Sequence, residues 1–294
     1  MEWPRISIVT PVFNQVQYLE QTILSVIGQK YPNLEYVIID GGSSDGTLDI
    51  IKKYEKHLTR WVSEKDNGMY DALQKGFAGT TGEIMLWINS DDILHAGAFE
   101  TIVEVFSSFP QIDWITGLNT IIDEQGRLSR AYPARRFSKY HFLTFDFQYI
   151  QQESTVWRRS LWERAGGRLE TSSRLAADFE LWLRFIHLTQ LYTCNLLIGG
   201  FRRRKDQLSF VFARQYVDEA NAFIRTARTN LAGKEKNKIR TLAIIRRLRK
   251  LLKYSIVLDL GIFDRTMNRI EKRIHSVPAI VERDWDTQKL ILLP

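Results

Sequence analysis

The stretch Ile84-Met-Leu-Trp-Ile-Asn-Ser-Asp-Asp-Ile-Leu94 decides the fold that we expect of this chain. Its apolar run, bounded by polar residues, predicts a buried strand. The run ends in Asn89-Ser-Asp-Asp92, so two adjacent carboxylates are expected where the strand ends. Ligands of open α/β sheets bind outside the carboxyl ends of the strands. We therefore expect a ligand site at Asp91 and Asp92.

The same two aspartates predict a divalent cation. Two close like charges repel each other unless a cation neutralises them. Mg²⁺ and Mn²⁺ prefer carboxylate oxygens and keep coordination positions free for phosphates. Taken alone, the pair also fits a turn with solvated acids, or N-caps for a helix over 95–107. The rest of the chain favours the cation.

Length and composition are those of a globular protein with one large domain, or with one domain and a small appendage. The chain has 294 residues, of which 44% are hydrophobic and 26% charged. Its single cysteine, Cys194, excludes an internal disulfide and is expected in the core. We see no signal peptide and no run near the ~18 apolar residues of a membrane span. These features predict a cytoplasmic protein.

The positive charge is concentrated in one segment. Between Lys234 and Lys253 nine Lys/Arg residues accompany one acid, Glu235, which gives a local charge of +8. Subtracting +8 from the net charge of +7 leaves about −1 for the rest of the chain. The basic character therefore belongs to one segment, and nucleic-acid binding is not expected.

Strand and helix patterns alternate over the first 90 residues. Strands are predicted at 6–13, 34–39, 61–64 and from 84, with helices over 18–28, 47–54 and 69–77. This alternation favours a parallel sheet with right-handed crossovers. Further on, a helix is predicted over 97–109 and a single strand over 113–122, closed by a hairpin-type turn at 123–126.

The Gly-rich turn Asp40-Gly-Gly-Ser-Ser-Asp-Gly-Thr47 follows the second strand. It is neither G-x-G-x-x-G nor a Walker motif, but its glycines let a ligand approach the backbone closely. We expect Asp40 to point a carboxylate into a crevice and accept hydrogen bonds from a base or a ribose. Asp45 is expected to organise the turn or cap the helix. Turn chemistry alone is an equally good interpretation.

Two charged segments mark the second half of the chain. Asp178 and Glu180 lie at the start of a predicted helix, where the helix dipole stabilises negative charge, and this alone explains them locally. Four consecutive basic residues, Arg202 to Lys205, lie on a predicted loop and suit phosphate. A solvated charge run explains that loop equally well.

Together, these segments resemble the inverting family 2 glycosyltransferases of the GT-A fold over residues 4–210. The resemblance implies an α/β fold with a mostly parallel central sheet flanked by helices. A Rossmann-like nucleotide-binding half would precede an acceptor-binding half. We expect a catalytic domain at 1–230 and a basic amphipathic helical extension at 231–294. The matching segments are 6–14 (opening strand), 40–47 (base-binding turn), 66–76 (donor-side helix), 89–92 (acidic motif), and 151–155, 166–167 and 177–184 (acceptor side).

The resemblance also implies roles for individual residues. The donor would be a nucleotide-diphosphate sugar, the cofactor Mg²⁺ or Mn²⁺, and the acceptor a hydroxyl of a glycan or lipid-linked precursor, as in polysaccharide biosynthesis. Asp178 would be the general base, Asp92 the main metal ligand and Asp91 a contact to ribose or metal. The other expected donor contacts are Pro11, Phe13, Asn14, Asp40, Gly42, Asp71, Lys75, Asn89, Arg202 and Arg204. The expected acceptor contacts are Gln152, Glu153, Trp157 and Glu180.

Two positions depart from the family pattern. Arg204 stands where many relatives have a histidine, and an arginine stays protonated and cannot ligate a metal. It would instead pair with the pyrophosphate of the donor. Asn89 opens the acidic motif where some relatives have aspartate. The departures weaken the expectation of a metal more than the expectation of the fold.

The segment 234–260 has the pattern of a basic amphipathic helix. This helix would either lie on an anionic membrane surface, as on the inner face of the membrane, or pack on the catalytic domain with a solvated basic face. The sequence alone leaves both open. The apolar positions are Ile239, Leu242, Ile245, Leu248, Leu252 and Ile256.

Two other functions fit parts of the sequence. A non-catalytic nucleotide-sugar-binding module would not need Asp40, Asp91, Asp92 and Asp178 together. A metal-dependent sugar nucleotidyltransferase would also use an aspartate pair, but it releases pyrophosphate instead of a nucleoside diphosphate. The transferase uses all four acids.

Overall fold

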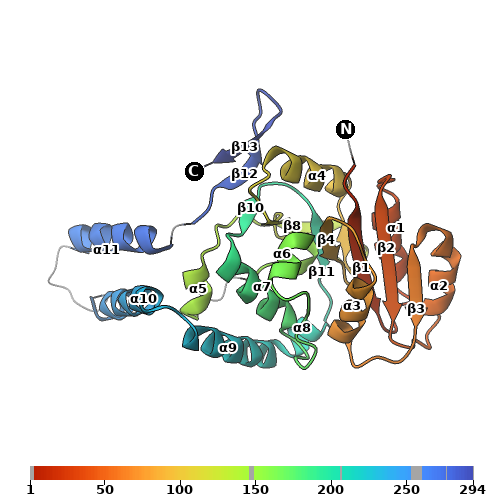
Figure 1. Cartoon of the computed structure of the whole chain (residues 1–294), viewed down its shortest axis with the longest axis horizontal. Helices are drawn as coiled ribbons and strands as arrows, with labels where there is room; N and C mark the ends of the chain where they lie inside the picture. The colour runs from red at the N-terminus through yellow and green to blue at the C-terminus, as the bar shows by residue number, and fades with distance from the viewer. Residues whose placement is uncertain (1–2, 146–148, 206, 253–259, 276, 294) are drawn as a thin grey trace.

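The computed structural model describes residues 3–145, 149–205, 207–252, 260–275 and 277–293. Its centre is a nine-stranded sheet with the strand order β13-β12-β10-β6-β9-β4-β1-β2-β3. Strands β1 to β3 lie at one end of the molecule, and helices α10 and α11 lie at the other end (Figure 1).

The first half of the sheet is parallel, as predicted. β1 pairs with β2 and β4, and β2 pairs with β3, all in parallel. The connecting helices pack back onto the sheet, which is the arrangement of right-handed crossovers. The elements are β1 (Ile6–Val12), α1 (Leu19–Ile27), β2 (Leu34–Asp40), α2 (Thr47–Tyr54), the 3-10 helix η1 (Glu55–His57), β3 (Arg60–Ser63), α3 (Met69–Ala78) and β4 (Ile84–Trp87).

Strands β1, β2 and β4 are buried on both faces because helices cover each side. Side chains alternate between the faces of a strand. On β4, Ile84 and Leu86 join the core under α1, α2 and α4 (Ala98–Ser108). Met85 and Trp87 join the core under α3, α6 (Arg159–Arg164), α7 (Ala177–Leu188) and α9 (Ala213–Thr229). This two-sided burial explains why the sequence of β4 is apolar throughout.

A cluster of tryptophans fixes α7 to the sheet. The Trp182 ring stacks on Trp87 of β4 with centroids 5.7 Å apart and planes at 6°. Trp157 meets Trp87 edge-on at 5.4 Å. Such aromatic pairs add about 0.5–1.5 kcal/mol each beyond their buried area. The helix that carries Asp178 is therefore packed directly on the strand that leads to the acidic pair.

The prediction of one strand over 113–122 is wrong. The segment forms β6 (Trp114–Thr116) in the large sheet and β7 (Thr120–Ile122) in a second sheet of order β5-β11-β7-β8. A Cβ at Gly117, between them, would come within 3.0 Å of Ile198 and of the Leu196 carbonyl. Glycine therefore lets the chain cross between the two sheets. The other strands of the second sheet are β5 (Ile93–Leu94), β8 (Leu128–Ala131) and β11 (Gly199–Arg202).

The middle of the chain completes the large sheet. β9 runs antiparallel between β4 and β6, and β10 is parallel to β6. Cys194 of β10 is fully buried, as predicted. The elements of this part are α5 (Lys139–Leu143), the 3-10 helix η2 (Gln152–Ser154), β9 (Thr155–Arg158), β10 (Tyr192–Cys194) and α8 (Leu208–Val211).

The C-terminal segment contains two helices and then two strands. Helices α10 (Gly233–Leu252) and α11 (Leu260–His275) lie in the segment for which we predicted a helical extension. The strands β12 (Ile280–Arg283) and β13 (Leu290–Leu293) were not predicted. β12 pairs in parallel with β10, so the end of the chain returns to the large sheet (Figure 1).

The apolar stripe of α10 faces the protein. Ile239, Leu242 and Ile245 are at most 4% exposed. Ile239 and Leu242 pack in one cluster with Tyr140 of α5 and Ile274 of α11. This arrangement supports the interpretation in which the helix packs on the rest of the chain. None of the described helices is long and apolar enough to cross a membrane. Of the predicted stripe, Ile256 lies outside the described residues.

Candidate active site

The acidic pair lies at the carboxyl end of β4, as predicted. Asp92 is 1% exposed, and its Oδ1 accepts a hydrogen bond of 2.8 Å from the backbone N–H of Arg202 on β11. Burial, together with the charges of Asp91 and Glu153, raises the pKa of Asp92 well above its usual range. A carboxylate in this position is costly unless a cation approaches it.

Arg204 supplies positive charge beside the pair. Its Nη2 lies 2.9 Å from Oδ2 of Asp91, and both side chains are mostly buried. Its guanidinium carbon lies 4.7 Å from the centre of the Tyr18 ring. Burial raises the pKa of Asp91, and the charge of Arg204 opposes that rise. The predicted basic loop thus meets the predicted acidic motif.

Arg202 has a different place from the one that we predicted. It is fully buried, and its guanidinium donates to the carbonyls of Asp91, Asp123 and Glu124 at 2.5, 3.0 and 2.8 Å. Its Nη2 donates to the Gln21 amide at 2.5 Å. The guanidinium makes its hydrogen bonds inside the protein. Arg202 therefore holds the acidic loop in place and does not contact a nucleotide-sugar donor.

The residues around Asp92 suit a divalent cation in their chemistry. Asn89 Oδ1 is buried without a hydrogen-bond partner among the described residues, and its Nδ2 lies 3.4 Å from Asp92 Oδ2. Amide and carboxylate oxygens are the ligands of Mg²⁺ and Mn²⁺. Within the described part of the chain no three His, Cys, Asp or Glu side chains form a ready-made metal cluster. The fitting set is therefore Asp91, Asp92 and Asn89.

Gln152, Glu153 and Trp157, predicted as acceptor contacts, lie inside the protein. Glu153 is 2% exposed, and burial, with the charge of Asp91, raises its pKa to about 8. The Gln152 amide donates to the backbone carbonyl of Trp87. Trp157 is fully buried in the tryptophan cluster, so its prediction as an acceptor contact is wrong. Gln152 therefore braces the end of β4, and neither Gln152 nor Glu153 is placed as predicted for an acceptor contact.

Asp178 lies at the start of α7, partly exposed. Its Oδ1 accepts hydrogen bonds from the Phe179 N–H at 2.7 Å and from the Tyr70 hydroxyl at 3.2 Å. Burial raises the pKa of Asp178 to about 6, although these hydrogen bonds lower it. A group with a pKa near the working pH is well suited to accept a proton.

Two tyrosines that sequence reasoning missed surround Asp178. Tyr70 of α3 is 4% exposed, and its hydroxyl also lies 2.9 Å from the Leu175 carbonyl. Tyr216 of α9 is the second, and burial together with the neighbouring charge of Asp178 raises the pKa of its hydroxyl well above the usual range. Tyr70 belongs to the donor-side segment 66–76, which was the available signal. Tyr216 lies beyond residue 210, where the resemblance ends.

The turn after β2 contradicts the prediction for Asp40. Its carboxylate is fully buried, and Oδ2 accepts hydrogen bonds from the N–H groups of Gly42 and Ser43 at 3.0 Å and from the Ser63 hydroxyl at 2.6 Å. It also binds the Ser43 hydroxyl. Asp40 therefore shapes the turn and does not open into a crevice. Asp45 organises the turn as predicted, accepting from the Thr47 N–H at 3.0 Å.

The end of β1 is tied to the same turn. Asn14, with a φ of 50°, donates its backbone N–H to Ser43 at 2.7 Å, and its side chain accepts from the Ser44 N–H at 2.9 Å. The Phe13 ring beside it is 58% exposed, whereas Pro11 is buried. An exposed aromatic ring next to a Gly-rich turn is a surface on which a base can stack.

The other predicted contacts are engaged locally. Asp71 accepts from the Asn67 N–H at 3.0 Å, and Lys75 lies 3.0 Å from Glu64 and 3.4 Å from Asp71. Glu180 pairs with Arg184 at 2.8 Å, one turn along α7. The described hydrogen bonds and ion pairs of these groups do not reach the acidic pair.

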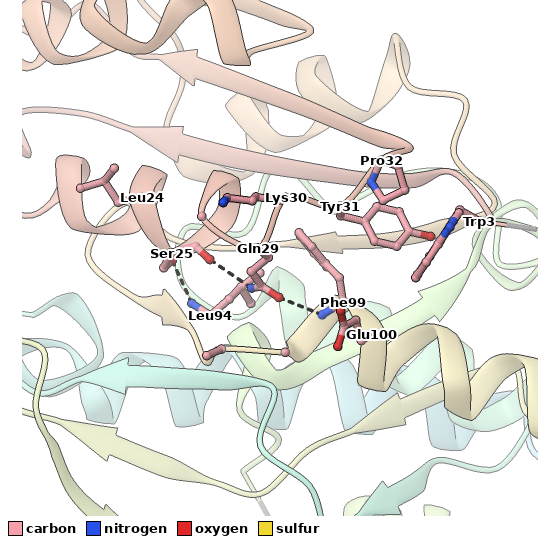
Figure 2. A pocket seen from close by; sticks show the side chains of 13 residues that line it. Trp3, Leu24, Ser25, Gln29, Lys30, Tyr31, Pro32, Leu94, Phe99 and Glu100 are labelled. Atoms are coloured by element: carbon pink, nitrogen blue, oxygen red, sulfur yellow. Dashed lines mark hydrogen bonds between the residues drawn. The ribbon is translucent and has the colours of Figure 1, made fainter. Parts of the chain in front are cut away.

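A well-defined hollow on the described surface lies elsewhere. It has a volume of about 510 Å³ and lies between the end of α1 and the start of α4 (Figure 2). Ser25 and Gln29 hydrogen-bond the Leu94 and Phe99 N–H groups at 3.0 Å across it. None of the predicted site residues lines it. We therefore base the site on the acidic loop and Asp178, not on this hollow.

Known proteins match about two thirds of the chain. The family described as glycosyl transferase family 2 matches residues 7–164. An uncharacterized glycosyltransferase of Mycobacterium tuberculosis is 30% identical over 200 residues, which cover 67% of this chain and 75% of that protein. One of Rickettsia typhi is 25% identical, over 64% of this chain and 61% of the relative. The match thus spans less than two thirds of the Rickettsia protein.

Solved structures share the fold. TarS 1–349 of S. aureus in complex with UDP-GlcNAc superimposes with a TM-score of 0.64 at 15% identity, over 92% of this chain and 81% of that chain. A Pyrobaculum calidifontis mannosyltransferase with GDP-Man and Mn²⁺ gives a TM-score of 0.53 at 16% identity, over 93% and 85%. The family match covers more than half of the chain, and the site lies at the strand ends that the fold provides. The chain is a glycosyltransferase of family 2 with the GT-A fold.

Proposed function

We propose that the protein transfers a sugar from a UDP-sugar to a hydroxyl acceptor with inversion at the anomeric carbon. The observation that carries the proposal is the position of Asp178. It is a carboxylate whose pKa burial raises to about 6, on a helix whose Trp182 stacks on β4 directly before the acidic loop. The TarS complex with UDP-GlcNAc supports the choice of UDP for the first test.

The proposed reaction is a single displacement. Asp178 takes the proton of the acceptor hydroxyl while the hydroxyl oxygen forms a bond to the anomeric carbon. The bond from that carbon to the phosphate oxygen breaks, and UDP leaves with the electron pair. One displacement inverts the configuration. Holding the two substrates in line supplies much of the rate enhancement.

A fixed positive charge would stabilise the negative charge of the leaving diphosphate. Arg204 is held by Asp91 at 2.9 Å and has several donor N–H groups for phosphate oxygens. Preorganised charge of this kind stabilises a developing anion in the transition state. Asp91, Asp92 and Asn89 would hold Mg²⁺ or Mn²⁺, which when bound neutralises diphosphate charge.

A shorter match supports the choice of acceptor class for this proposal. A putative teichuronic acid biosynthesis glycosyltransferase of Bacillus subtilis is 35% identical over 94 residues, 30% of this chain and 36% of that protein. We infer an acceptor of the glycan or lipid-linked glycan class. If the protein associates with a membrane, the exposed basic face of α10 carries the contact, since the apolar stripe is buried.

The test uses the whole chain with UDP-sugars and GDP-sugars. Binding of UDP and GDP is measured by calorimetry with Mg²⁺ or Mn²⁺, and turnover by release of the nucleoside diphosphate. Asp178→Asn should reduce turnover by about 10² to 10⁴-fold and leave UDP affinity within about twofold, because the general base does not hold the donor. Asp218→Asn, an exposed acid on α9, is the matched control. Near-normal turnover of Asp178→Asn, or release of pyrophosphate, disproves the mechanism.

A further inference from the structure

The absence of a side chain at position 41 leaves room for a neighbouring carboxylate. Gly41 directly follows Asp40 at the end of β2, and it is not among the glycines with a positive φ. A Cβ at this position would lie 2.8 Å from Oδ2 and 3.2 Å from Oδ1 of Asp66. A real Cβ does not approach an atom within 3.0 Å, so the glycine leaves the space that the Asp66 carboxylate fills.

The segment that carries Asp66 is held beside the turn. The Glu64 N–H donates to the Asp40 carbonyl at 3.0 Å, which continues the β2–β3 pairing past Ser63. Asp66 Oδ1 accepts from the Gly68 N–H at 2.8 Å. The carboxylate therefore has a fixed orientation over Gly41, set by one backbone hydrogen bond and by the strand pairing.

Asp66 keeps an acceptor atom that Asp40 has lost. Both Asp40 oxygens are engaged by the turn, and the side chain is fully buried. Asp66 is partly exposed, and in the described part of the chain its Oδ2 has no hydrogen-bond partner. At this strand end, where the exposed Phe13 ring also lies close to the turn through Asn14, Asp66 offers an oriented carboxylate oxygen.

We propose that Asp66, seated over Gly41, selects the base of the nucleotide donor by accepting a hydrogen bond from a ring N–H of uracil or guanine. The inference rests on the proposed function and adds a specificity-determining residue to it. A carboxylate only accepts hydrogen bonds, so it favours a base with a ring N–H. It disfavours cytosine and adenine, which present a lone pair at that ring position. Sites built to pair an N–H discriminate strongly against analogues that lack it.

UDP and CDP provide the decisive comparison because their rings have the same size. Calorimetry on the full chain should give a wild-type affinity for UDP at least about tenfold above that for CDP. Asp66→Asn keeps an oxygen for the Gly68 N–H, and its amide can donate to the cytosine ring nitrogen. We expect the Asp66→Asn variant to bind UDP about tenfold more weakly than the wild type and to bind CDP as well as or better than the wild type. The preference for UDP over CDP is then lost. GDP against ADP is the parallel comparison for a purine donor.

A carboxylate transplant separates base selection from a purely structural role. Gly41→Ala should displace the Asp66 carboxylate and lower the affinity for UDP, as Asp66→Asn does. Gly41→Asp combined with Asp66→Ala places a carboxylate in the same space from the other side. We expect this double variant to regain UDP affinity to within a few fold of the wild type. Asp49→Asn, an exposed acid on α2, controls for charge loss, and circular dichroism shows whether each variant is folded.

The possible results separate base selection by Asp66 from the proposed transferase function. If the wild type binds UDP or GDP but Asp66→Asn keeps the full preference over CDP or ADP, base selection by Asp66 is wrong and the transferase proposal stands. If the wild type binds neither UDP nor GDP, both proposals fail. A lost preference in Asp66→Asn supports the inference even if the double variant does not fold.

Discussion

The Trp182 ring lies parallel to the Trp87 ring, with centroids 5.7 Å apart and planes at 6°. Trp87 is the last residue of β4, before the acidic loop, and Trp182 is one turn after Asp178 on α7. One aromatic contact therefore joins the strand that presents Asp91 and Asp92 to the helix that presents the proposed base. Because close-packed interiors transmit displacement, we expect this contact to influence the distance between Asp178 and the acidic pair.

Trp182→Phe should loosen this spacing without emptying the core. A smaller ring leaves a cavity, and we expect a loss of about 1–3 kcal/mol in the free energy of unfolding. Turnover should fall more than UDP affinity, since the donor contacts do not lie on α7. Thermal unfolding and steady-state kinetics measure both effects. Unchanged turnover in a destabilised variant would mean that the contact serves stability alone.

The rate should depend on pH through Asp178. Only the ionised carboxylate accepts a proton, and burial raises its pKa to about 6, so kcat/KM should fall as the pH drops below 6. Tyr70→Phe removes a hydrogen bond that lowers this pKa. The acidic limb should therefore move to higher pH, while UDP affinity at pH 8 stays the same. A limb that does not move excludes Tyr70 as a partner of the titrating group.

Arg204 offers a test of how the diphosphate is neutralised. Arg204→Ala leaves Asp91 beside Asp92 without its ion pair, so we expect UDP affinity without a divalent ion to fall about tenfold or more. Arg204→His introduces a side chain that can ligate a metal, so Mn²⁺ should restore more affinity to it than to the alanine variant. Calorimetry with EDTA or Mn²⁺ measures both. Arg130→Ala, exposed on β8, is the control, and a loss of the same size there would assign the effect to net charge.

Two leucines of the apolar stripe of α10 differ in exposure, so their substitutions should differ in cost to stability. Leu242 is 3% exposed and packs toward α5 and α11, so Leu242→Ala should cost about 2–5 kcal/mol in stability. Leu248 is 37% exposed, and its substitution should cost well under half of that. Chemical unfolding without lipid compares them directly. Equal, small losses would mean that the stripe does not face the protein.

Vesicle binding tests the basic face of the same helix. We expect sedimentation with anionic vesicles at low salt that disappears as the salt concentration rises, because a contact through lysine and arginine side chains is screened. Neutral vesicles serve as the control. Absence of binding to anionic vesicles at low salt rules out the membrane contact.

The sequence was sufficient where local pattern and fold agree. The apolar run from Ile84 and the alternation before it predicted the parallel strands, because a strand covered on both faces has no polar positions. The break at Gly117 could not be predicted, since it depends on contacts with Ile198 and Leu196, about 80 residues further along the chain.

Residue roles were harder to predict than elements. Asp40 and Arg202 have the residue types that a donor site needs, but long-range partners such as Ser63 and Gln21 engage them. Their burial depends on tertiary neighbours that no local spacing shows. Asp178 was proposed as the base from the resemblance, and its neighbour Tyr216 comes from a helix outside that resemblance.

The return of the chain to β10 bears on how the protein can be shortened. The guanidinium of Arg283 on β12 pairs with the Glu104 carboxylate on α4 through two contacts of 2.9 and 2.5 Å. The β12–β13 hairpin covers an edge of β10. A protein cut at residue 230 would present the bare backbone of β10 to solvent, and bare strand edges pair with one another between molecules. Such a fragment should aggregate even though every proposed catalytic residue is present. The β12–β13 hairpin thus protects an edge of the catalytic sheet that would otherwise be exposed.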